Sequence, residues 1–374
     1  MNIIVLFSQP WRIGGAETHV EALIKGLSHD SIFLIVNKGS DEIKLTKLQQ
    51  DYPNTRVFSM QFRGINLFGW VSDFIKIVTI AKEQRIDIIS AQQRTAGTWA
   101  YLLNKLIAVP FTVTMHDSWH RALFRKCYSR LFPTMIVVSN NLQEILKKKF
   151  GFKATQIHLI NNGVDFSKFV SKNKEICRNS LGLTSNNKLI VHVSRLSSIK
   201  GAVSLRLIDS MAEVTKLKPN VRLVIIGEGP LRSTIDAKAA DFNAKYGDVI
   251  QLENFTDTIT EWYNAADIII GEGRVAIEAL ACERPVVAIR NGGSFLGAIT
   301  LKNISEAIEA NFDKADKTVT IQELTSEIGT AFSLDKNECA QIATQVRGKL
   351  GIDEMAGKYK MVFSTEGGCK CEKY

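Results

Sequence analysis

The segment IIIGEGRVAIEALACERPVVAI, residues 268–289, contains a complete strand–helix–strand unit. A run of isoleucines ends at a Gly-Glu-Gly turn, a helix-period stretch that carries Glu278 follows, and a second apolar run closes the unit. Parallel strands require a crossover connection such as this helix, whereas antiparallel strands can be joined by a short turn. The segment therefore predicts a parallel sheet with a glycine turn and a carboxylate where one of its strands ends.

Short apolar runs and helix-period stretches alternate in the same way along most of the chain. Strands are predicted at residues 2–8, 31–36, 56–60, 86–90, 110–115, 134–138, 188–193, 221–226, 249–252, 267–270 and 285–289. Helices are predicted at residues 15–28, 70–84, 94–107, 119–131, 140–149, 201–216, 230–245, 259–265, 273–282 and 340–360. Such alternation is typical of a parallel sheet covered by helices on both faces, and continuous Val, Ile and Leu runs agree with two-sided burial.

One polar stretch divides this pattern into two series. Residues 161–187 are rich in Asn and Lys and contain no strand candidate, and a new series then opens at KLIVHVSR. Because 374 residues exceed what one hydrophobic core usually supports, we predict two domains. They are residues 1–165 and residues 166–340, and the segment 341–374 is expected to form a helix that crosses back to the first domain, followed by a tail. We expect the ligand site at the carboxyl ends of both sheets, in a cleft between the domains.

The composition narrows the classes of partner. A formal net charge of +9 favours nucleic acid, anionic lipid or phosphorylated small molecules. Nucleic acid ranks last, because the sequence has no zinc-finger spacing, RNP-like strand or long basic arm. The first residues read as a buried strand rather than a signal peptide, and no apolar run reaches the roughly 18 residues of a membrane-spanning helix. We therefore expect a cytoplasmic protein with reduced cysteines.

Glycine turns and two cations mark the places where strands pass into helices. Gly14 and Gly15 precede the first predicted helix, and glycines of this kind let a ligand approach the backbone beside a helix N-terminus. Their spacing is not G-x-G-x-x-G, so a nicotinamide dinucleotide is not expected. In IVHVSRLSSIKG, Arg195 and Lys200 follow a buried strand, and two fixed cations can neutralise a diphosphate without a metal. The simpler alternatives are an ordinary tight turn and two solvated loop cations.

Six motifs, in order, then connect the chain with a known family. GGAETH, TMHD, NNGVDFSKF, VSRLSSIKG, VIIGEGPL and AIEALACERPVVA occur within residues 1–295. Together they resemble the retaining glycosyltransferases of family 4, which have the GT-B fold of two facing Rossmann-like, doubly wound domains with a cleft between them. The resemblance implies transfer of a hexose from a nucleotide diphosphate sugar to a saccharide or lipid-linked acceptor, in cell-surface polysaccharide or glycolipid synthesis. It also implies that no metal or other cofactor is needed.

The resemblance assigns roles to particular residues. Arg195 and Lys200 match the pair that grips the donor diphosphate, and Glu278 matches the carboxylate that binds the ribose hydroxyls. His116 matches a histidine beside the transferred sugar, and we count it with Arg195 and Lys200 as catalytic. The remaining donor-binding residues that the resemblance implies are Gly14, Gly15, Gly227, Gly229, Phe255, Gly271, Glu272 and Gly273. The diphosphate oxygen is expected to take the acceptor proton, with attack on the face that the diphosphate leaves.

Two positions depart from the family pattern. The family usually carries a first glutamate eight residues before the second, and here that position is Ile270. Glu272 or Glu228 could take over its contact with the donor sugar. Gln92 or Gln93 stands where many relatives have histidine, and the following Arg94 is a candidate for binding an acceptor phosphate.

A basic stretch bears on the membrane. In the predicted helix 119–131, Leu123, Phe124 and other apolar residues fall on one side, and the cations Arg121, Arg125, Lys126 and Arg130 cover the other. This helix could rest on an anionic membrane near a lipid-linked acceptor, on the inner face of the membrane, or it could simply bury its apolar side against the sheet. Two rival functions stay open: a nucleotide-sugar epimerase on the GT-B scaffold, and a catalytically silent GT-B binding subunit.

Overall fold

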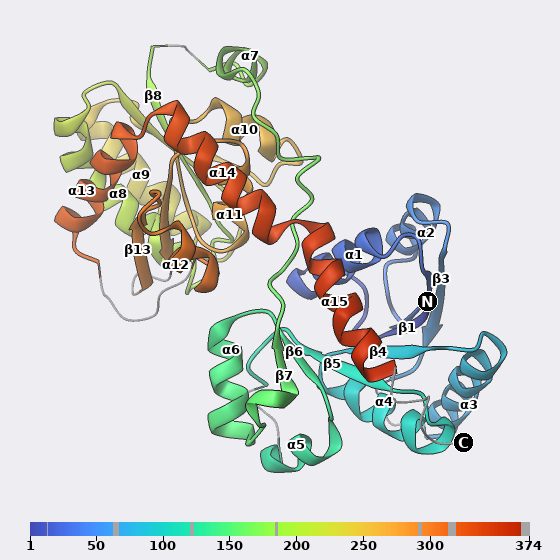
Figure 1. The fold of residues 1–374 in the computed structure, drawn as a ribbon. Coiled ribbons are helices and arrows are strands. Elements are labelled where there is room, and N and C mark those ends of the chain that lie inside the picture. Colours follow the sequence, from blue (N-terminus) through green and yellow to red (C-terminus); the bar gives the residue numbers. More distant parts are fainter. Residues whose placement is uncertain are drawn as a thin grey trace. The chain divides into compact units, whose positions relative to one another are not determined.

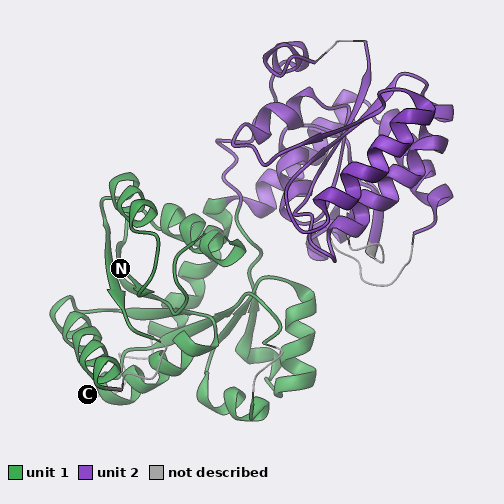
Figure 2. Cartoon of the chain, turned by 180° about the vertical axis from the view of Figure 1, so that it is seen from behind, with its two compact units in different colours: residues 1–163, 352–374 green, residues 164–351 purple. Residues whose placement is uncertain are grey.

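Two parallel sheets organise the computed structural model, which describes residues 1–12, 14–62, 67–119, 123–183, 186–290, 294–312 and 319–367. The chain divides into unit 1, residues 1–163 with 352–374, and unit 2, residues 164–351 (Figures 1 and 2). Each unit has its own sheet with helices packed on both faces. The predicted α/β class with two Rossmann-like units is therefore confirmed.

Unit 1 is built on a seven-stranded, fully parallel sheet of order β3-β2-β1-β4-β5-β6-β7. The strands are β1 (Asn2–Phe7), β2 (Ser31–Asn37), β3 (Thr55–Met60), β4 (Ile88–Gln92), β5 (Phe111–Met115), β6 (Met135–Val137) and β7 (Ile157–Leu159). In β1 the side chains of Ile4 and Leu6 join one core, and those of Ile3, Val5 and Phe7 join the other. This alternation explains why the strand is apolar at every position from Ile3 to Phe7.

The helices of unit 1 are α1 (Gly15–Gly26), α2 (Glu42–Asp51), α3 (Leu67–Glu83), α4 (Arg94–Ile107), α5 (Tyr128–Leu131), α6 (Asn140–Ile145) and α15 (Ile352–Gly367). Residues of α3 and α4 pack in one core of the unit, and residues of α1 and α15 pack in the other. Figure 1 shows α15 lying against α1, although more than 300 residues separate them in the sequence. The C-terminal helix is thus an integral part of unit 1.

Unit 2 has a six-stranded sheet of order β10-β9-β8-β11-β12-β13, in which β13 alone is antiparallel. Its strands are β8 (Lys188–Val193), β9 (Val221–Ile226), β10 (Ile250–Glu253), β11 (Ile268–Gly271), β12 (Val286–Arg290) and β13 (Ser294–Ala298). Its helices are α7 (Lys174–Ser180), α8 (Gly201–Leu217), α9 (Arg232–Tyr246), α10 (Ile259–Ala265), α11 (Arg274–Ala281), α12 (Ile304–Glu309), α13 (Ile321–Ser333) and α14 (Lys336–Leu350).

Both sheets have a topological switch point at their centre. In unit 1 the chain leaves β1 toward β2 on one side and β4 toward β5 on the other, and in unit 2 β8 and β11 diverge in the same way. Loops that leave neighbouring strands in opposite directions open a crevice at the carboxyl ends of those strands, which is where open α/β sheets bind ligands. The strand order therefore directs attention to the loops after β1, β4, β8 and β11.

Two sequence predictions need correction. The predicted segment 341–374 is divided at Gly351, whose extended backbone separates α14 in unit 2 from α15 in unit 1. The tail 368–374 lies outside the described residues. The predicted helix 119–131 is not continuous, because Phe124 has a left-handed backbone (φ +50°) and only a 3-10 turn at Arg125–Cys127 and the single turn α5 follow it. Residues 120–122, including Arg121, are not among the described ones.

Candidate functional site

The loop that carries Arg195 is fixed against the loop after β9. A Cβ atom on Gly227 would lie 1.9 Å from the carbonyl oxygen of Ser194, and one on Gly229 would lie 2.6 Å from that of Leu196. Both glycines also have positive φ angles, +151° and +154°, which other residues rarely adopt. The backbone N–H of Leu196 donates to the carbonyl of Glu228 at 2.9 Å. These predicted donor-binding glycines thus hold the backbone on both sides of Arg195.

The two predicted diphosphate-binding cations differ in their surroundings. The Arg195 side chain is exposed and makes no hydrogen bond or ion pair with another described residue. Lys200, which caps the start of α8, forms an ion pair with Glu272, which directly follows β11. This pair spans the switch point between β8 and β11. One cation is therefore available to an anion, and the other already has a carboxylate partner.

Glu278 is buried on α11, with only 7% of its surface exposed. The hydroxyl of Tyr263 donates a hydrogen bond to its Oε2 at 3.1 Å, and Arg274, one helical turn earlier, forms an ion pair with its Oε1. Burial raises the pKa of this carboxyl, and the Arg274 guanidinium opposes that rise. Tyr263 and Arg274 were not predicted from the sequence, although the i,i+4 spacing of Arg274 and Glu278 could have suggested their pairing.

Steric constraints explain the two glycines of the Gly-Glu-Gly turn before α11. Gly273 has φ +49° and immediately precedes the helix, so another residue there would be strained. A Cβ atom on Gly271 would lie 2.5 Å from a methyl group of Val275. Both glycines let α11 start directly at the end of β11, and this tight turn leaves no room for the longer loop of the family.

The position of the family's first glutamate is closed to solvent. Ile270 is fully buried in β11, and its carbonyl binds Nδ1 of His192 at 2.9 Å. His192 lies in β8, and burial lowers its pKa to about 4, so the imidazole is neutral. Of the two predicted substitutes, Glu272 is beside Lys200 and Glu228 is an exposed loop residue.

The loops after β9 and β10 are joined by an arginine that the sequence did not single out. The Arg232 guanidinium donates to the carbonyls of Gly227 and Glu253 and to Oδ1 of Asn254, at 3.1, 3.0 and 3.0 Å. The neighbouring Phe255 has 68% of its surface exposed, so the predicted nucleobase position is open to a ligand.

In unit 1, Gly14 directly precedes α1 and Gly15 is its first residue. A Cβ atom on Gly15 would have no neighbour within 4 Å, and one on Gly14 would meet only the flexible carboxylate of Glu17. Gly14 has an extended backbone that any residue can adopt. Unlike the glycines of unit 2, these two are not required by the packing of the protein itself.

His116 lies just after β5 and is held by two neighbours. Its Nε2 hydrogen-bonds Oε1 of Gln92 at 2.8 Å, and its ring meets that of His19 edge to face, with the centroids 4.7 Å apart. Burial, and to a smaller extent His19, place its pKa well below the ordinary 6.5. Gln92 is thus the glutamine that faces the predicted site, whereas Gln93 binds Asp117 and Trp119.

Arg94, the predicted acceptor-phosphate residue, is the first residue of α4. It is half-buried, and its guanidinium makes no ion pair within the part of the chain that the structure describes. The sequence did not single out His19, whose ring packs on His116, or Tyr359, whose hydroxyl hydrogen-bonds His19 at 2.8 Å, although His19 belongs to the GGAETH motif.

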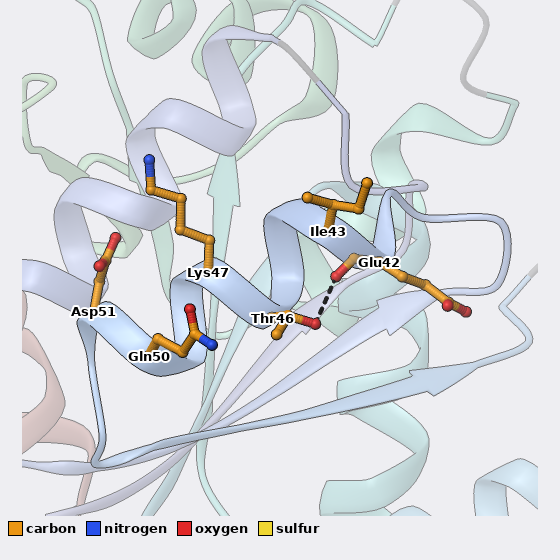
Figure 3. A pocket seen from close by; sticks show the side chains of 6 residues that line it. All are labelled: Glu42, Ile43, Thr46, Lys47, Gln50 and Asp51. Atoms are coloured by element: carbon orange, nitrogen blue, oxygen red, sulfur yellow. Dashed lines mark hydrogen bonds between the residues drawn. The ribbon is translucent and has the colours of Figure 1, made fainter.

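None of these residues lines the surface pocket on α2. It is lined by one exposed face of α2, by Glu42, Ile43, Thr46, Lys47, Gln50 and Asp51 (Figure 3). Because its lining comes from successive turns of a single helix, it offers no converging polar groups of the kind that binding sites show.

Known protein families match both units of the chain. The family model "Glycosyltransferase Family 4" matches residues 13–168, and "Glycosyl transferases group 1" matches residues 155–316. The chain belongs to the family 4, group 1 glycosyltransferases of the GT-B class. It spans about half or less of the length of the first curated relatives that it matches.

One curated relative and two solved structures are similar to this chain over most of its length. The capsular polysaccharide biosynthesis glycosyltransferase CapM of Staphylococcus aureus is 27% identical, over 79% of this chain and 82% of the relative. A glycosyltransferase from Rickettsia africae has a TM-score of 0.76 at 20% identity, covering 99% of this chain and all of its own. Anabaena HepE in complex with UDP has a TM-score of 0.72 at 21% identity, and the match covers 98% of this chain and 100% of the HepE chain. At these identities, the structural likeness concerns the fold.

Among the described residues, no group of three His, Cys, Asp or Glu side chains is placed to hold a metal ion. No described helix combines the length and apolar character that crossing a bilayer requires.

Proposed function

We propose that this protein transfers a hexose from a nucleotide diphosphate sugar to a saccharide or lipid-linked acceptor in cell-surface polysaccharide or glycolipid synthesis. Family membership, the name of CapM and the UDP complex of the structurally similar HepE support this proposal. The observation that carries it is the placement of Arg195, Lys200, Glu272 and Glu278 around the β8/β11 switch point of unit 2.

Unit 2 holds the donor. Arg195 and the N–H groups at the start of α8 and α11 bind the diphosphate, and Glu278 accepts hydrogen bonds from the ribose. The diphosphate also competes with Glu272 for Lys200, because both are anions. Once displaced, Glu272 binds the sugar hydroxyls in place of the family's first glutamate, whose position is taken by Ile270.

Sugar transfer proceeds with retention and without a metal. The diphosphate leaves with its charge balanced by Arg195 and Lys200, and one of its oxygens takes the acceptor proton. His116 supports the cationic sugar as a neutral imidazole, consistent with its lowered pKa. The backbone at Gly14 and Gly15 faces the donor phosphates, and Arg94 binds a phosphate of the acceptor.

Replacement of the cations tests the proposal. We expect Arg195→Ala and Lys200→Ala to lower sugar transfer about tenfold or more, since each loses a hydrogen bond between charged groups. Arg222→Ala is the matched control, because Arg222 is an exposed cation near the amino end of β9. The donor is found first by screening UDP, GDP and ADP sugars for thermal stabilisation. Losses below twofold in both variants would refute the assigned site.

The tight turn after Ile270, which lacks the family's first glutamate, favours one rival function, a silent subunit that binds nucleotide without turnover. The second rival function is that of a nucleotide-sugar epimerase. Analysis of the products with and without acceptor distinguishes the three functions. Transfer needs the acceptor, epimerisation proceeds without it, and a silent subunit consumes no donor.

We further propose that residues 123–131 attach the protein peripherally to an anionic membrane on its inner face. Leu123 and Phe124 have 74% and 82% of their surface exposed, beside Arg125, Lys126 and Arg130. Exposed apolar side chains next to cations suit the boundary of an anionic bilayer. Flotation with phosphatidylglycerol vesicles should weaken when Phe124 and Arg125 are both replaced by Ser. Absence of binding by the wild-type protein would end the idea.

A further inference from the structure

A buried polar cluster in unit 1 joins three elements behind His116. His19 on α1 binds Oδ1 of Asn162 through Nδ1 and the hydroxyl of Tyr359 through Nε2, both at 2.8 Å. The Tyr359 hydroxyl also lies 3.0 Å from Oγ1 of Thr114 on β5. His19 and Tyr359 are almost fully buried, so these hydrogen bonds are shielded from water.

The partners define the direction of each hydrogen bond. The Asn162 oxygen can only accept, so His19 donates through Nδ1–H. Burial lowers the pKa of His19 to about 4, and in the neutral ring Nε2 must then be an acceptor. Tyr359 therefore donates to His19, which leaves its oxygen to accept from Thr114. The cluster fixes one tautomer of His19 and the orientation of its ring.

His116 is oriented in turn by two contacts. Gln92 donates through Nε2 to Oγ of Ser90 at 3.0 Å, so its Oε1 accepts from His116 Nε2–H. The His19 ring, held at both nitrogens, meets the His116 ring edge to face. His116 then keeps an unprotonated Nδ1, which can accept a hydrogen bond from a sugar hydroxyl.

We propose that Tyr359 and His19 are positioning residues that hold the ring of His116, whose tautomer is set by Gln92, so that its Nδ1 accepts from the transferred sugar. The proposal rests on the proposed role of His116 in transfer. It also gives α15 a function, because this C-terminal helix of unit 1 carries the hydroxyl that His19 binds through Nε2.

Imidazole nitrogen NMR of the full chain tests this arrangement without requiring activity. In ¹⁵N-histidine-labelled protein at pH 7, we expect His19 protonated only at Nδ1 and His116 only at Nε2. His19→Gln and His116→Asn identify the signals. A wild-type spectrum in which either histidine is the other tautomer, or is charged, overturns the proposal.

Steady-state kinetics test whether the position of His116 affects the rate of sugar transfer. Tyr359→Phe should alter the His19 signals and lower kcat about tenfold or more, since small misplacements of catalytic groups have large effects, with the donor KM within about twofold. Thr114→Val should also lower kcat, and it replaces Tyr359→Phe as the test variant if Tyr359→Phe fails to fold. Thr112→Val is the control, because this buried hydroxyl on the same strand has no partner among the described residues.

The outcomes separate this inference from the proposed function. An unchanged kcat in Tyr359→Phe or, where that variant does not fold, in Thr114→Val overturns the inference, as does an equal loss in Thr112→Val. If the wild-type protein transfers no sugar although nucleotide binds unit 2, the proposed function fails, and the inference fails with it even where both tautomers are as expected.

Discussion

At the scale of single residues, Glu278 shows how a site depends on unexpected partners. Its carboxylate is buried, and Tyr263 and Arg274 compensate for the loss of water. The sequence indicated the carboxylate and its helix, because both follow from the local pattern. It could not indicate Tyr263, which lies on α10 and reaches Glu278 only through tertiary packing.

Removal of the Tyr263 hydroxyl tests this partnership. In Tyr263→Phe the Glu278 Oε2 loses its buried donor, which should cost about 1–3 kcal/mol of unfolding free energy. Nucleoside diphosphate affinity should fall several-fold, because Glu278 is no longer fixed. Denaturation and calorimetric titration measure the two effects, and Tyr246→Phe, at an exposed tyrosine of the same unit, is the control. Unchanged affinity would contradict this view of Glu278.

His192 links a single residue to the pH dependence of stability. Its pKa is about 4 in the folded protein, against an ordinary 6.5, because burial disfavours the charged ring. Between these values the unfolded chain binds a proton that the folded one does not, so stability falls as the pH drops from 6.5 to 4. The loss is on the order of 3 kcal/mol for this group. His192→Leu should flatten the pH dependence of the unfolding free energy, and an unchanged slope would rule out this explanation.

At the scale of elements, the long apolar runs predicted most strands because each is buried on both faces. The strands β7 and β13 were missed, since β7 has only three residues and β13, with the sequence SFLGA, contains a glycine and no long apolar run. The prediction of a helix at residues 119–131 was wrong, because hydrophobic periodicity does not reveal the left-handed backbone of Phe124. The glycines and cations of the candidate loops were evident in the sequence, but the steric reason for each glycine was not.

Two glycine substitutions distinguish a glycine that the packing of the protein requires, Gly227, from one that is proposed to serve sugar transfer, Gly15. Gly227→Ala should lower the unfolding free energy by about 3 kcal/mol, because its Cβ would overlap the Ser194 carbonyl at a positive φ. Gly15→Ala should leave stability unchanged or raise it by up to about 1 kcal/mol, since α1 begins there in open space. Transfer should nevertheless fall in Gly15→Ala. Equal stability of the two variants, measured by denaturation, would be inconsistent with these roles.

At the scale of the whole molecule, the sequence predicted two α/β units and the return of the last helix. The division at Gly351 could not be predicted, because α14 and α15 read as one helical pattern. Contacts between distant segments, such as Tyr359 with His19, depend on which unit each helix joins. The sequence pattern therefore indicated the loops at the switch points better than the distant groups that orient their side chains.

We propose above all that the loops after β8 and β11 bind a nucleoside diphosphate without a metal. Calorimetric titration of the full chain with UDP, GDP and ADP in the presence of EDTA tests it most directly. We predict that one of them binds the wild-type protein and the Arg222→Ala control equally, and binds Arg195→Ala at least about tenfold more weakly. Equal affinity in Arg195→Ala, or no binding of any of the three, would contradict the claim.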